Sequence, residues 1–208
     1  MKRFLQLMSG FLLLTFTITG PAAVIVDLYG DKDSFDLGTT LVDGDTFNIG
    51  LIPLVNNSDD PCTDVLLNRI GSGLTCNTPL GTTSYTHTYD LTGLGSIVSA
   101  SIELFSGGAG QLGPTNVYAD GNLIGTLSNG NTGTTTVTAQ LDVFDLSAFA
   151  AALNGATLLQ ITTGYLLDAW VLDYSELTIV TADLPEPSLL SLLGLGLLGF
   201  GMARRKKA

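Results

Sequence analysis

The chain has 208 residues, of which 45% are hydrophobic, and a formal net charge of −11, so one folded domain with peripheral segments is expected. Residues 24–183 contain 16 aspartates and two glutamates against only Lys32 and Arg69. A surface this acidic repels nucleic acid and anionic lipid, because both are polyanions, and is better suited to calcium, cationic partners or neutral sugars.

Residues 1–23 are predicted to be a secretory signal peptide. Lys2 and Arg3 precede an apolar segment, and small residues then offer a cleavage site after Ala22 or Ala23. The alternative is an uncleaved membrane anchor. Export would place the rest of the chain in an oxidising compartment.

The stretch "GDKDSFDLG" at 30–38 is the best candidate for a cation site. Asp31, Asp33 and Asp36 could turn several carboxylate oxygens inward, and such oxygens are the ligands that calcium prefers. The segment is not an EF-hand, because Phe35 stands at the third ligand position. The alternative is an acidic surface turn.

The chain has two cysteines, Cys62 and Cys76, and both lie in the exported part. They are predicted to form a disulfide. Closing a loop of about 15 residues contributes on the order of 3 kcal/mol in the chain-entropy model. Metal ligation is not expected, because no second pair of cysteines or histidines stands nearby.

The middle of the chain is predicted to form many short antiparallel strands, since turn-forming residues recur about every ten residues among Thr and Val. In "SYTHTYDL", Tyr85, His87 and Tyr89 share one face of a strand. His87 is the only histidine in the chain. It is interpreted as a structural or surface residue, because no motif supports a Ser-His-Asp site.

Further elements follow in order. Strands are predicted at 97–105, 134–143, 157–164 and 170–180, and a hairpin at 116–127 turns at Asp120-Gly121. One short helix is predicted over 146–155, with Ser147 as its N-cap and Gly155 just past its end.

The closing strand contains a change of face. Its buried-looking residues occupy even positions up to Tyr174 and odd positions from Leu177. A β-bulge near Ser175 and Glu176 would explain the change, and so would a strand that is covered on both faces. Either explanation fits an antiparallel β-sandwich of the jelly-roll or Greek-key type, which is the predicted fold class.

The stretch "DAWVLDYSEL" at 168–177 resembles the closing strand of jelly-roll carbohydrate-binding modules. The resemblance implies that an acidic residue on this strand helps to hold a structural calcium. First and last strands can be neighbours in such folds, so Asp173 would join the N-terminal acids. The alternative is that Asp173 binds local backbone groups and Trp170 belongs to the core.

The C-terminal residues 184–208 combine three features in a fixed order: "PEP" at 185–187, an apolar stretch of Leu and Gly over 189–203, and the basic residues Arg204, Arg205, Lys206 and Lys207. The apolar stretch is shorter than the roughly 20 residues of an ordinary spanning helix. The basic cluster is expected to stay in the cytoplasm by the positive-inside rule.

This arrangement resembles the PEP-CTERM sorting signal of Gram-negative bacteria. The resemblance implies that an exosortase, an integral-membrane protease, recognises the tail and cuts near Pro185, Glu186 and Pro187. The protein would be held briefly in the inner membrane by its C-terminal helix and then passed to the outer envelope or extracellular matrix. The alternative is a plain C-terminal anchor.

The expected organisation is therefore a signal peptide at 1–23, a β-sandwich ectodomain at 24–183 and a sorting signal at 184–208. The expected function is that of a non-catalytic surface or matrix protein associated with exopolysaccharide and biofilm. No cofactor is expected other than calcium, and nucleic acid is not an expected partner.

Two alternatives remain for the function. The first is a lectin-like carbohydrate-binding module, with or without calcium, whose available rings are Tyr85, Tyr89, Tyr118, Tyr165 and Trp170. The second is a secreted glycoside hydrolase that uses a carboxylate pair. Outside the tail the only glutamates are Glu103 and Glu176, and neither lies in a recognisable motif.

Overall fold

The computed structural model describes residues 22–52, 62–64, 67, 81–110, 112–130, 132–133, 135–163 and 169–183. Ala23–Ala182 form one compact unit. The predicted signal peptide up to Pro21, Cys76 and the tail from Leu184 lie outside the described residues. Within the described ranges, no helix has the length and apolar character needed to cross a bilayer.

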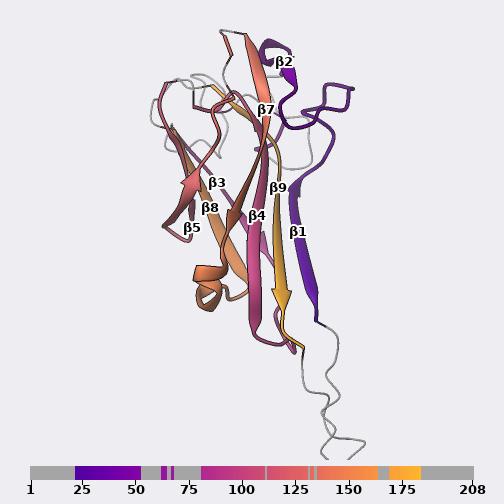
Figure 1. Cartoon of the computed structure of the whole chain (residues 1–208), viewed down its shortest axis with the longest axis vertical. Helices are drawn as coiled ribbons and strands as arrows, with labels where there is room; N and C mark the ends of the chain where they lie inside the picture. Colours follow the sequence, from indigo (N-terminus) through magenta and orange to yellow (C-terminus); the bar gives the residue numbers. More distant parts are fainter. Residues whose placement is uncertain are drawn as a thin grey trace, which may run out of the picture. The chain divides into compact units, whose positions relative to one another are not determined.

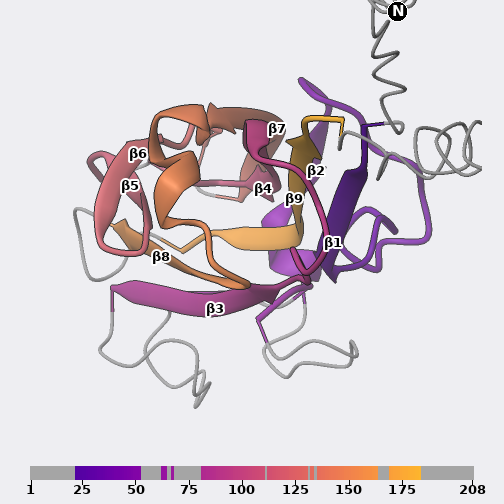
Figure 2. The same cartoon turned by 90° about the horizontal axis from the view of Figure 1, so that it is seen from below.

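Two antiparallel sheets pack into a sandwich, as the sequence predicts (Figures 1 and 2). The five-stranded sheet has the order β1 (Val24–Gly30), β9 (Val171–Thr181), β4 (Ile97–Gly107), β7 (Thr136–Asp145) and β2 (Thr46–Asn48). The four-stranded sheet has the order β3 (Thr82–Thr88), β8 (Ala156–Thr163), β5 (Thr115–Ala119) and β6 (Asn122–Thr126).

The first and last strands are neighbours. β1 pairs with β9 along its whole length, from Val24 opposite Val180 to Gly30 opposite Tyr174. The entry and exit of the sandwich therefore lie together at one end, at the bottom of Figure 1, while the loop that follows β1 lies at the other.

The main core fills the space between the sheets. Alternate residues of the central strands point into it, because successive side chains of a strand face opposite sides. Its fully buried members include Ile102, Leu104, Leu159, Ile161 and Trp170. Burying each such large apolar side chain contributes about 1.5–3 kcal/mol.

A second core covers one end of the outer face of the five-stranded sheet. The fully buried ring of Phe35 stacks on Phe47 at 4.8 Å and on Phe105 at 5.3 Å. Ser34, Phe35 and Asp36 have φ angles of 70°, 64° and 54°. Left-handed backbone costs a non-glycine residue about 1–2 kcal/mol, so the burial of Phe35 offsets strain in the loop that follows β1.

A β-bulge interrupts β9 where the sequence changes face. Tyr174 lies opposite Phe105 and Leu172 opposite Ser106, so Asp173 is the extra residue. The bulge expected near Ser175 therefore exists, but two positions earlier.

The other explanation for the change of face also holds. The first half of β9 is covered on both sides, because Leu172 belongs to the main core while Val171 and Tyr174 belong to the second.

The turn and helix predictions have different outcomes. The hairpin at Asp120-Gly121 is confirmed, with φ angles of 48° and 79°. The predicted helix is a 3-10 helix, η3 (Ser147–Ala152), preceded by Leu146 at the cap position. Ser147 is therefore the first residue of the helix and not its N-cap, and its amide donates a hydrogen bond to the Asp145 carboxylate at 2.8 Å. A second 3-10 turn, η1 (Ile49–Leu51), and the strands β1 and β2 were not predicted as separate elements.

Cys62 is buried beside the start of β9. Its expected partner Cys76 lies outside the described residues, so the disulfide stays a prediction.

Candidate metal centre

Four aspartates meet where β1 ends and β9 begins. One carboxylate oxygen from each lies within 4.8 Å of the others, and we call this group the acidic centre: Asp31, Asp33, Asp64 and Asp173. The four residues come from three segments: the loop after β1, the short segment 62–64, and the bulge of β9.

Backbone contacts bring these segments together. Gly30 ends β1 at a φ of 84°, and a Cβ there would overlap the carbonyl oxygen of Asp173 and lie 2.6 Å from the Thr63 methyl group. The amide of Asp64 donates a hydrogen bond to the carbonyl of Leu172 at 2.8 Å. The segment 62–64 is thus held along β9, and Gly30 permits the close approach of β1.

Asp173 fixes the loop that follows β1. Its carboxylate accepts a hydrogen bond from the Phe35 amide at 2.6 Å, and its side chain is 1% exposed. Burial raises the pKa of Asp173 to about 7, against the opposing effect of this hydrogen bond. The bulge therefore turns the carboxylate of Asp173 toward the loop.

Asp64 is the member of the acidic centre whose buried carboxylate is least stabilised by its surroundings. Asp64 is 2% exposed, and neither of its carboxylate oxygens accepts a hydrogen bond from the residues that the structure describes. Burial, followed by the negative charge of Asp173, raises the pKa of Asp64 to about 9. Asp31 and Asp33 lie at the exposed side of the acidic centre.

The structure brings together three of the four residues proposed from the sequence. Asp36 is the exception: it is exposed and outside the acidic centre, and its amide donates a hydrogen bond to the Asp33 carboxylate at 2.8 Å. Asp64 takes the fourth place instead. The stretch "CTD" gave no signal for it, because the position of Asp64 depends on long-range pairing with β9.

Lys32 stands between Asp31 and Asp33 in the sequence, but its side chain interacts with glutamates outside the acidic centre. Its amine lies 2.8 Å from the Glu176 carboxylate, 4.0 Å from that of Glu103, and 4.5 Å from the centre of the Tyr174 ring. The Tyr174 hydroxyl donates a hydrogen bond to Glu103 at 2.7 Å. The two glutamates are cross-strand neighbours, and both take part in this ionic network.

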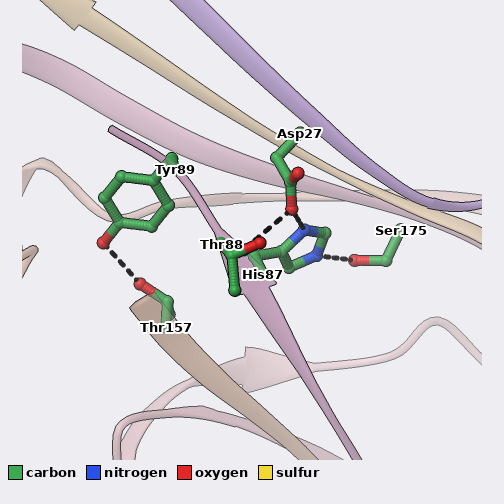
Figure 3. Close-up of polar contacts among 6 residues, drawn as sticks. All are labelled: Asp27, His87, Thr88, Tyr89, Thr157 and Ser175. Atoms are coloured by element: carbon green, nitrogen blue, oxygen red, sulfur yellow. Dashed lines mark hydrogen bonds and ion pairs between the residues drawn. The ribbon is translucent and has the colours of Figure 1, made fainter. Parts of the chain in front are cut away.

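A second polar group spans the two sheets (Figure 3). His87 on β3 bonds through Nδ1 to the Asp27 carboxylate on β1 and through Nε2 to the Ser175 hydroxyl on β9, each at 2.8 Å. Asp27 also accepts a hydrogen bond from the Thr88 amide at 3.1 Å. These contacts place a buried polar link between the sheets.

The order of groups in this link is that of a Ser-His-Asp site, but its surroundings differ. Ser175 and His87 are both 0% exposed. A catalytic serine must present its oxygen to a substrate carbonyl, and a fully enclosed hydroxyl cannot do so in this conformation. The arrangement of His87 therefore supports a structural role.

The comparisons with known proteins concern the tail and the sandwich separately. Residues 183–206 match the family model of the PEP-CTERM protein-sorting motif. No curated protein is significantly similar to the chain. Among solved structures, the dimeric latent PorU from Porphyromonas gingivalis is similar over 79% of this chain, at 11% identity and a TM-score of 0.38.

The chain spans only 13% of the PorU chain, and a TM-score of that size supports no conclusion about fold or activity. The tail gives the firmer result, because its match covers the "PEP" residues, the apolar stretch and most of the basic cluster. The chain is therefore a PEP-CTERM motif-containing protein, a secreted substrate of an exosortase.

Proposed function

We propose that the sandwich is a non-catalytic module that acts in the outer envelope or in the exopolysaccharide matrix. The observation that carries this proposal is the position of the sorting motif. The motif begins at residue 183, directly after β9 ends at Thr181. Cleavage near residues 185–187 would thus release the whole sandwich with only a few residues of tail.

The state of the candidate catalytic groups supports a non-catalytic role. Ser175 is enclosed beside His87. Glu103 and Glu176 share the single described lysine, Lys32, and Glu103 also binds the Tyr174 hydroxyl. Carboxylates that already serve an ion pair are poor candidates for the acid and base of glycoside hydrolysis.

The aromatic residues favour a matrix module over a lectin with a stacking platform. Sugar rings stack on exposed aromatic faces, but Trp170 and Tyr85 are buried, and Tyr85 is stacked on Tyr29 at 4.3 Å. Tyr89 and Tyr118 are partly exposed, and Tyr165 lies outside the described residues.

The proposal is tested by following the chain in its host with and without the exosortase. With the protease, the shortened protein should be found in the envelope or matrix fraction. Without it, the full-length chain should remain in the inner membrane. Glu186→Ala should slow the release, whereas Ser191→Ala, within the apolar stretch, should not. Full-length protein in the inner membrane of both strains would contradict the proposal.

The matrix association needs a separate comparison. In a host that makes no exopolysaccharide, the released protein should pass from the matrix fraction into the medium. An unchanged distribution would contradict the association with polysaccharide. A clear hit on a glycan array would favour the lectin-like alternative.

A further inference from the structure

We propose that the acidic centre binds one calcium ion, which fastens three separate segments of the chain to each other. The site lies at the end of the sandwich opposite to the start of β1 and the end of β9, because these two strands run from one end to the other. The proposal does not depend on the matrix role argued above.

Asp64 provides the main evidence. A carboxylate that is buried without a partner costs several kcal/mol, so buried carboxylates in native proteins are paired or coordinate metal ions. Asp64 is 2% exposed and lies within the acidic centre, and among the described parts of the chain no group donates a hydrogen bond to its two oxygens. A cation between the four carboxylates would supply the missing partner.

The distances favour calcium among the common divalent cations. Calcium binds oxygens at about 2.3–2.6 Å, so two oxygens on opposite sides of one ion lie up to about 5 Å apart. The oxygens of the acidic centre lie within 4.8 Å of each other. Magnesium, with bonds of about 2.0–2.1 Å, limits oxygens on opposite sides of the ion to a separation of about 4.2 Å.

The chemistry of the carboxylate ligands also favours calcium. All four side chains offer carboxylate oxygens, and the described residues of the acidic centre include no thiolate or imidazole. Hard oxygen donors suit calcium, whereas zinc is usually held by nitrogen and sulfur. Four carboxylates held this close together repel each other when charged, and a calcium ion between them would supply the counter-charge.

The ion would have a structural role, because it would hold three segments of the chain together. Asp31 and Asp33 belong to the loop that inserts Phe35 into the second core, Asp64 belongs to the segment beside Cys62, and Asp173 forms the bulge of β9. A ligand that binds only the folded state raises the free energy of unfolding in proportion to the logarithm of its concentration over Kd. Calcium should therefore raise the melting temperature.

The test uses the full chain, purified in detergent and freed of metal with a chelator. Calorimetric titration with calcium chloride should give about one site per chain, and thermal unfolding should show a higher Tm with calcium than with chelator. Asp64→Asn should weaken calcium binding at least tenfold. The matched control is Asp36→Asn, which removes a carboxylate from the same loop system but outside the acidic centre.

The melting temperatures of the metal-free proteins show whether a substitution weakens calcium binding or only disturbs folding. Because Asp64→Asn removes an unpaired buried carboxylate, its Tm in chelator should equal or exceed that of the parent chain, while its gain in Tm with calcium should disappear. Asp33→Asn, at the exposed side, is a second variant that should weaken binding.

Three results would overturn the proposal. They are the absence of calcium binding in the parent chain, an equal loss of binding in Asp36→Asn and Asp64→Asn, and magnesium binding as tight as that of calcium.

Discussion

At the scale of single residues, the polar groups inside the sandwich decide how its parts are joined. His87 is enclosed between the sheets, and its two nitrogens contact Asp27 and Ser175 on the opposite sheet. A buried polar group costs free energy unless it is bonded. The link through His87 therefore favours one alignment of the two sheets over others.

Replacing His87 by alanine should lower the free energy of unfolding by about 3 kcal/mol, because it leaves a cavity and removes a partner from Asp27 and Ser175. Urea unfolding measures this change. Thr86→Ala, at an exposed position of the same strand, is the control and should change stability by less than about 0.5 kcal/mol. A similar small change in His87→Ala would show that the link contributes little.

Gly30 gives a second prediction at this scale. Gly30→Ala should destabilise the fold by about 2 kcal/mol more than Gly121→Ala, as measured by urea unfolding. Both glycines have positive φ angles, 84° and 79°, so they share the backbone strain. Of the two, the Cβ added at Gly30 would overlap the Asp173 carbonyl and the Thr63 side chain, whereas the one added at Gly121 would have no atom of the described residues within 4 Å. Equal losses would mean that the close approach to β9 is not required.

At the scale of elements, the sequence predicts the strands with strong alternation and misses those without it. The pattern around Tyr85 and His87 predicts the inward face of β3 correctly. β2 has only three residues, too few for a periodic signal. η3 forms as a 3-10 helix although "SAFAAA" suits an α-helix, and its N-cap is Leu146 rather than Ser147.

The acidic centre shows where local patterns fail. Asp31 and Asp33 could be proposed because they stand in an acidic motif, and Asp173 because its strand resembles the closing strand of jelly-roll carbohydrate-binding modules. Asp64 could not, because its position is fixed by a hydrogen bond to Leu172, more than 100 residues later in the chain. Asp36 shows the converse, since a residue of the same motif turns away from the group.

The pairing of β1 with β9 gives a prediction about processing. The carbonyl of Ala23 accepts hydrogen bonds from the amide of Thr181 at 2.9 Å and from its hydroxyl at 3.4 Å. A cut after Ala22 retains these bonds, whereas a cut after Ala23 removes them. N-terminal sequencing of the exported protein should therefore give alanine and then valine. A sequence that begins with Val24 would contradict this prediction.

At the scale of the whole molecule, the first and last strand residues of the sandwich are adjacent, and the acidic centre is remote from them. Val24 lies opposite Val180, and six residues further on β1 reaches Gly30, next to the acidic centre. At about 3.3 Å per residue the separation is about 20 Å. Changes in the acidic centre should therefore leave cleavage of the tail unaffected.

The last ladder contacts show where the folded unit ends and how far the tail can be cut back. Thr181 bonds to Ala23, and the amide of Ala182 donates to the carbonyl of Ser96 at 2.7 Å. A chain that ends at Asp183 keeps these bonds and should have the Tm of the full chain. A chain that ends at Ile179 loses them, together with the Val180 pairing to Val24.

The shorter chain should lose about 2–4 kcal/mol of stability, since each hydrogen bond contributes about 0.5–1.5 kcal/mol net. Thermal and urea unfolding of the two truncated chains measure the difference. Equal stability would mean that the end of β9 contributes nothing to the fold. A lower Tm for the chain ending at Asp183 than for the full chain would mean that the sandwich depends on its sorting tail. An exosortase could then not release it in a stable form, because cleavage near residues 185–187 separates the two.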